Sequence, residues 1–219
     1  KELYKILLDP IAQDLEKAKA KTLMWSLDGI LRYLPPAALH DGKKYLVESY
    51  RNTIFTLTSY TRIKETLNGH WNVLGLGVSK AVAQAGPLPA VKDELFGIIN
   101  ETFRGLELLS LSACNTAMGD NEIDGTEVES FAELAQKQGA KSVIASLWSV
   151  NDKSTASLMQ KFYALRKSNP SLSKVEALQQ AQLALLTGNV ILPGSEQASK
   201  IKYSHPHYWA PFILIGHWK

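Results

Sequence analysis

The chain has a single cysteine, Cys114, among its 219 residues, and this excludes an internal disulfide. It has no apolar run of the roughly 18 residues that a membrane-spanning helix needs, and nothing at its start resembles a signal peptide. A reducing cytoplasm is therefore the compartment that we expect. Because the chain begins KELYKILLDP, without an initiator methionine, we also expect it to be a domain cut from a longer protein.

Several kinds of site are also missing from the sequence. The net charge is only +3 and no stretch is dense in Lys or Arg, so we predict no contact with nucleic acid and no contact with a membrane. His205 and His207 have no third ligand beside them, and we predict no metal and no cofactor. The segment GLGVSKA lacks the third glycine of a dinucleotide fingerprint, which leaves a nucleotide-binding domain as a weak alternative. A G-x-S-x-G nucleophile elbow is absent too, and this argues against an α/β-hydrolase.

What the sequence does contain is an alternation of predicted strands and helices. The predicted strands are 22–29, 53–59, 72–78, 106–114, 142–150 and 212–216. The predicted helices are 3–18 with a kink at Pro10, 88–100, 127–139, one capped by Asp152, and one that starts at the capping box Ser173/Glu176 and ends near Gly188. This order predicts an α/β fold with a mostly parallel central sheet and helices on both faces, preceded by an N-terminal helix and a small β segment.

Cys114 follows a strand that reads as buried, and this position makes it a candidate nucleophile. Ligands and chemistry collect at the carboxyl ends of parallel strands, where a neighbouring imidazole can lower the pKa of a thiol. The alternative is that Cys114 is a small apolar side chain that fills the core, as free cysteines often do. Position alone does not choose between the two.

Several ordered motifs resemble a known family. They are LSLSACNTAMG, DGTEVESFAELAQKQGAKSVIASLWSVND, STASLMQKFYALRK and HPHYWAPFILIGHW, with LDGILRYLPPAALHDGKKYLVESY upstream. Together they resemble the CHAT domain, a caspase-like peptidase domain that is often fused to TPR repeats. The resemblance implies a caspase-like three-layer fold, with residues 1–60 as an N-terminal helix and strand segment and 61–219 as the peptidase core.

The resemblance also implies roles for individual residues. Cys114 matches the nucleophile of the family's S-A-C-x-T motif, and its backbone N–H would help to form the oxyanion hole. By the same analogy Asp120, Trp148 and Asp152 are candidate pocket residues for a protein substrate, although Asp152 also suits a helix cap. An N-terminal TPR-like repeat domain or a regulatory protein is the implied partner.

The histidine of the implied Cys/His dyad is missing from its place. In the family it follows a strand between 72–78 and the Cys114 strand, yet residues 79–105 contain no histidine. His70 precedes the first core strand and should lie at the opposite edge, whereas His217 follows the last strand and could face the catalytic side. Loss of the histidine strand should leave a gap with unpaired backbone groups. We therefore predict that a segment is missing near Asn100–Glu101.

Two functions follow from these observations. The first is a caspase-like cysteine endopeptidase that acts through an acyl-enzyme. The second is a caspase-like scaffold with an incomplete dyad, acting as a regulatory or protein-interaction module. The S-A-C-N-T context favours the first and the missing histidine favours the second.

Overall fold

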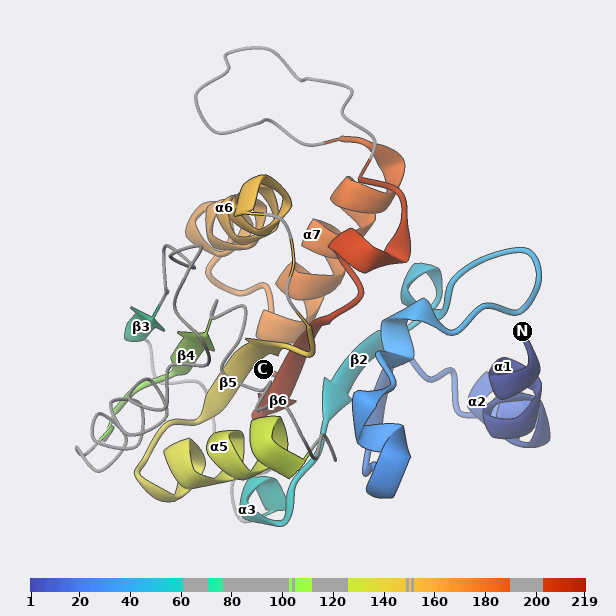
Figure 1. Ribbon diagram of the computed structural model, residues 1–219, viewed down its shortest axis with the longest axis horizontal. Helices are drawn as coiled ribbons and strands as arrows, with labels where there is room; N and C mark the ends of the chain where they lie inside the picture. Colours follow the sequence, from blue (N-terminus) through green and yellow to red (C-terminus); the bar gives the residue numbers. More distant parts are fainter. Residues whose placement is uncertain are drawn as a thin grey trace, which may run out of the picture. The chain divides into compact units, whose positions relative to one another are not determined.

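The computed structural model describes residues 1–60, 71–76, 103, 105–111, 126–148, 150, 152–189 and 203–219 (Figure 1). Among these residues, no helix is both long enough and apolar enough to cross a membrane. Contacts between residues divide the chain into two compact units. The first is Lys1–Trp25, Pro35–Thr53 and Asn151–Pro211, and the second is Ser26–Leu34, Ile54–Val150 and Phe212–Lys219.

The strands form a six-stranded, mostly parallel sheet, and this confirms the predicted α/β class. The strands are β1 (Thr22–Trp25), β2 (Arg51–Ile54), β3 (Val73–Leu76), β4 (Leu108–Leu111), β5 (Ser142–Ser146) and β6 (Phe212–Gly216), in the order β1-β2-β6-β5-β4-β3. The pairs β2–β6, β3–β4 and β4–β5 are parallel, and β5–β6 is antiparallel.

The first unit holds most of the helical residues that the structure describes. It contains α1 (Glu2–Leu7), η1 (Asp9–Ile11), α2 (Ala12–Lys17), η3 (Pro36–Ala38), η4 (Leu46–Glu48), α6 (Asp152–Ser168), α7 (Lys174–Thr187) and η5 (Pro206–Tyr208). The predicted N-terminal helix is interrupted at Pro10, as its missing N–H requires. Helices α6 and α7 pack side by side, and Leu158 and Phe162 of α6 are fully buried.

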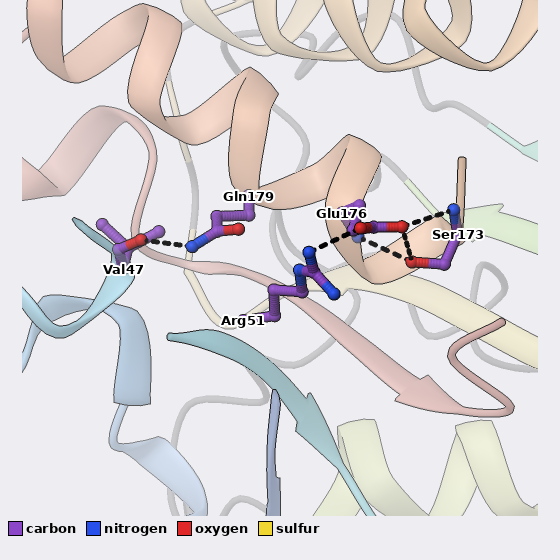
Figure 2. Close-up of polar contacts among 5 residues, drawn as sticks. All are labelled: Val47, Arg51, Ser173, Glu176 and Gln179. Atoms are coloured by element: carbon purple, nitrogen blue, oxygen red, sulfur yellow. Dashed lines mark hydrogen bonds and ion pairs between the residues drawn. The ribbon is translucent and has the colours of Figure 1, made fainter. Parts of the chain in front are cut away.

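Helix α7 shows how local sequence sets an element and then ties it to its neighbours (Figure 2). The predicted capping box is present: the Glu176 N–H donates to Ser173 Oγ, and Glu176 Oε2 accepts from the Ser173 N–H at 3.0 Å. The helix ends at Gly188, whose φ of +75° is the left-handed conformation of a helix stop. The Glu176 carboxylate also pairs with Arg51 of β2, and Gln179 Nε2 donates to the Val47 carbonyl at 2.7 Å.

The second unit contains strands β3 to β6 with α5 (Thr126–Lys137), α3 (Leu57–Tyr60) and η2 (Gly29–Tyr33). Helix α5 packs on β5 and β6 and lies beside α3. Ala132 and Ala135 of α5 are fully buried, and Phe131 is half-buried. Strand β6 is buried along its whole length, as a central strand must be.

One predicted strand is wrong over half of its length. Residues 53–59 read as an alternating β-branched run, yet β2 ends at Ile54 and Leu57–Tyr60 is the helix α3. The reason is a reciprocal pair of hydrogen bonds: the Ser59 N–H donates to Thr56 Oγ1 at 3.2 Å, and the Thr56 N–H donates to Ser59 Oγ at 3.3 Å. Hydroxyl side chains that bond to nearby backbone groups favour a helix start over a sheet ladder.

The expected gap in the sheet is also not found. Strands β3 and β4 pair directly in parallel, from Val73 opposite Leu108 to Leu76 opposite Leu111. The Asn72 carbonyl accepts from the Glu107 N–H at 2.9 Å and so extends this ladder by one step. The predicted helix 88–100 and the suspected seam at Asn100–Glu101 lie outside the described residues.

Candidate active site

The strand that leads to Cys114 is held rigidly from both sides. Leu108 and Leu109 of β4 have no exposed surface, and β4 pairs in parallel with β3 on one side and with β5 on the other. One residue before β4, the Glu107 carbonyl accepts a hydrogen bond from the Ser142 hydroxyl at 2.6 Å. Cys114 follows Leu111 by three residues and, like Asp120, lies outside the described residues.

A buried ion pair anchors the amino end of the same strand. Glu107 Oε1 lies 2.7 Å from Lys141 Nζ, and the two side chains are only 4% and 10% exposed. Neither residue was a candidate from sequence, because a contact between residues so far apart leaves no local pattern. The pair fixes the start of β4 against the residue that precedes β5.

The carboxyl ends of three strands meet at one edge of the second unit. Because β3, β4 and β5 run parallel, Leu76, Leu111 and Ser146 all end at this edge. Neighbouring strands lie about 4.8 Å apart, so segments that leave β4 and β5 start from adjacent points. This is the edge where an α/β sheet places its chemistry.

The structure describes two of the predicted pocket residues. Trp148 follows β5 by two residues and is half-buried, so it leaves the sheet at the edge just defined. Asp152 is the first residue of α6 and is exposed, and its place in the first helical turn suits the helix dipole. The N-cap position before it, residue 151, lies outside the described residues, so both roles of Asp152, in the pocket and as a helix cap, stay predictions.

His217 lies at the wrong edge to act as the base. Strand β6 is antiparallel to β5, with Gly216 opposite Ser142 and Phe212 opposite Ser146. His217 therefore follows β6 at the amino ends of β4 and β5, where its N–H donates to the Lys141 carbonyl at 3.0 Å. The five residues of β5 span roughly 13 Å at about 3.3 Å per residue, and this length separates the amino edge, where His217 lies, from the carboxyl edge. The expectation that His217 could face the catalytic side is wrong, because it assumed a parallel last strand.

Of the other four histidines, three lie in the first unit and one lies outside the described residues. His40 Nδ1 accepts from the Gly42 N–H at 2.9 Å, and His205 Nδ1 accepts from the His207 N–H at 3.2 Å. His205 and His207 thus hydrogen-bond to each other within one loop. His70 is not among the described residues. Within the described part of the chain, no three His, Cys, Asp or Glu side chains gather as metal ligands would.

A second buried network lies at the amino edge of the sheet. Gln136 of α5 has no exposed surface; its Oε1 accepts from the Thr56 hydroxyl at 2.8 Å, and its Nε2 donates to Ser59 Oγ at 3.4 Å. The Gln136 amide also lies against Gly216, which has a φ of +99°. This network joins α3, α5 and β6 in one unit.

Comparison with known proteins supports the motif resemblance. A family model described as the CHAT domain matches residues 1–105 and, in a second segment, residues 97–217. The two segments overlap at 97–105, which includes the suspected seam. No curated protein matches the chain.

Proposed function

Because the chain belongs to the CHAT domain family, we propose that it is a caspase-like cysteine endopeptidase domain with Cys114 as its nucleophile. The observation that carries the proposal is the setting of β4, a strand whose residues Leu108, Leu109 and Ser110 are buried and which pairs in parallel with β5 and leads toward Cys114. A thiol that follows the end of such a strand starts from a fixed backbone position. The fold alone does not imply this chemistry, and the S-A-C-N-T motif supplies the link.

The proposed reaction follows the general scheme of cysteine peptidases. A histidine takes the thiol proton, the sulfur attacks the scissile carbonyl carbon, and a carbon–sulfur bond forms as the carbonyl oxygen becomes an oxyanion. The oxyanion collapses, the carbon–nitrogen bond breaks, and the imidazolium gives its proton to the departing amine. Water then attacks the thioester and releases the acid. Backbone N–H groups near Cys114 would stabilise both oxyanions.

The base in this proposal comes from a segment that the 219 residues lack. The division of the family match into two segments, which overlap at 97–105, supports a missing segment there, in the interval where the resemblance places the histidine strand. We propose Asp120, Trp148 and Asp152 as pocket residues, with the acidic ones favouring a basic side chain before the scissile bond. A protein substrate, a cytoplasmic location and control by an N-terminal repeat domain or a regulatory protein complete the proposal.

The single cysteine makes the test direct, because any thiol label reports on Cys114 alone. The rate of labelling by iodoacetamide is measured from pH 5 to 10, beside cleavage of a fluorogenic peptide library. The same measurements are made on a form that carries the family's histidine segment between Asn100 and Glu101. A peptidase gives a thiol pKa well below the usual value of about 8.5 in that form, with cleavage that Cys114→Ser abolishes. Labelling at least 100-fold slower than that of free cysteine in both forms would mean that Cys114 fills the core, and would refute the proposal.

A second function is favoured by one observation. The direct pairing of β3 with β4 makes the sheet of the described strands continuous without the histidine strand. Such a chain can fold as a scaffold that binds partners and cleaves nothing. Rapid labelling of Cys114 at an ordinary thiol pKa, with no cleavage in either form, would support the scaffold over the peptidase.

A further inference from the structure

Strand β1 is an edge strand of the sheet, and part of its surface is exposed. It stands at the end of the strand order, and the described part of the chain has β2 as its only strand neighbour. Its four residues TLMW include no proline and no charge, the two devices that often protect a sheet edge. Met24 is 46% exposed, and the other three side chains are half-buried.

The backbone of β1 also presents hydrogen-bonding groups on its outer side. The Lys21 carbonyl accepts from the Arg51 N–H at 2.9 Å, so Lys21 points its backbone groups toward β2. Along a strand the N–H and C=O of successive residues point to alternate sides. Thr22 and Met24 therefore turn their N–H and C=O groups outward, away from β2. These are the groups that an added strand would pair with.

Positive charge gathers where β1 begins. Lys17, Lys19 and Lys21 are exposed and fall within five residues. Lys17 lies 4.0 Å from Asp14 in an ion pair that is more than 70% exposed on both sides, and such pairs contribute little. Lys21 contributes to the lowered pKa of Glu176. Lys19 and Lys21 are the charged side chains nearest to β1, so two β1 strands brought together would bring four lysines into one region, which disfavours a second copy of the chain and favours an acidic segment.

We propose that β1 is a docking edge for an extended segment of a protein partner, in which acidic residues flank an apolar one. The segment adds as a seventh strand, pairs with the outward backbone groups of Thr22 and Met24, and packs its apolar side chain on Met24. The thioether of Met24 adapts to different apolar shapes. The acidic residues lie against Lys19 and Lys21. This surface is independent of the chemistry proposed for Cys114.

The experiment uses a fluorescein-labelled peptide of alternating valine and threonine with two aspartates at each end, and the whole chain as receptor. Fluorescence anisotropy gives the dissociation constant, and amide hydrogen exchange locates the contact. Exchange should slow at Thr22 and Met24 and stay unchanged at Lys43 and Lys44, whose N–H groups already donate to Asp41. A peptide with proline at every second position cannot form a ladder and should not bind.

Three variants separate backbone from charge. Met24→Pro removes the outward N–H at a position where an edge strand tolerates proline, and should weaken binding about tenfold. Lys19→Gln with Lys21→Gln should weaken it about threefold and reduce its dependence on salt. Lys43→Gln with Lys44→Gln makes the same charge change on an exposed turn of the same unit and should have no effect.

Several results would overturn the proposal. They are an absence of slowed exchange at 1 mM peptide, equal binding of the proline peptide, and equal effects of the two lysine pairs. Concentration-dependent dimers that Met24→Pro abolishes would mean that a second copy occupies β1, which also contradicts the proposal. If a melting curve shows that Met24→Pro does not fold, the exchange data and the lysine pairs decide alone.

Discussion

Gly216 is a position where one added methyl group should be strongly destabilising. It ends β6 with a φ of +99°, a conformation that other residues adopt only at a cost. A Cβ added there would overlap the Gln136 amide nitrogen and come within 2.7 Å of the Lys141 carbonyl oxygen. Gly216→Ala therefore adds backbone strain and also forces a buried side chain out of its hydrogen bonds.

The size of the effect can be worked out from these two contributions. The positive φ costs an alanine roughly 1–2 kcal/mol. Displacing Gln136 disturbs its bonds to Thr56 and Ser59 in a site with no exposed surface, and each buried group left unpaired costs about 1–3 kcal/mol. The sum is about 4 kcal/mol, a large part of the 5–15 kcal/mol that holds a typical domain together. At about 2–4 °C per kcal/mol for a chain of this size, the melting temperature should fall by roughly 8–16 °C.

Gly188→Ala is the matched control. Gly188 also has a positive φ, +75°, but a Cβ there would meet nothing within 4 Å. It should therefore lower the melting temperature by only about 2–8 °C, the share of the backbone alone. In a chain that already carries Gln136→Ala, the obstructing amide is gone, so Gly216→Ala should cost less stability there than it does in the wild type. If both glycine variants melt within 2 °C of each other, the Gln136 contact is not a constraint and the reasoning fails.

Three further predictions concern single contacts. Ser173→Ala removes the helix cap and should cost about 1 kcal/mol, whereas Ser168→Ala at the exposed end of α6 should cost less in the same chemical denaturation assay; equal losses would contradict the role of the cap. Lys141→Met leaves Glu107 buried without its cation and should cost about 3–5 kcal/mol, and adding Glu107→Leu should recover most of that loss; a double variant no more stable than the single one would argue against the pair. Burial raises the pKa of Glu176, but hydrogen bonds from Ser173 and the nearby cations outweigh it, so that the pKa lies below its ordinary value of 4.5. A lowered pKa stabilises the fold above pH 4.5, and this stabilisation is lost as the pH falls through the pKa of the folded state. The stability lost in Glu176→Gln at pH 7 should therefore shrink below pH 4.5. A loss that stays constant down to pH 2 would contradict this.

Local contacts explain what the sequence predicted well. The capping box of α7 joins residues three apart, and the break at Pro10 follows from one missing N–H, so both are visible in a short stretch. Buried strands such as β5 and β6 are visible as continuous apolar runs. In each case the cause of the structure lies within the residues that form it.

Non-local pairing explains what the sequence did not predict. The apolar run of β6 is the same whether it runs parallel or antiparallel to β5, so the edge at which His217 lies could not be inferred from it. The ion pair of Glu107 with Lys141 depends on which strands become neighbours. The start of α3 is a different case, because the bonds between Thr56 and Ser59 are local but were outweighed by a strand-like composition.

The pairing of β3 with β4 sets a condition on any catalysis at Cys114. The neighbours of β4 are β3 and β5, and both end at the same edge as β4, the strand that precedes Cys114 in the sequence. The residues after β3 are Gly77, Val78 and Ser79, and those after β5 lead through Trp148, so neither neighbour is followed by a histidine in the sequence. A base that arrives on a strand between β3 and β4, as the family resemblance implies, must replace the ladder that joins Val73 to Leu108. In the 219-residue chain that ladder is formed. The direct β3–β4 pairing and a Cys/His dyad of the family type therefore exclude each other.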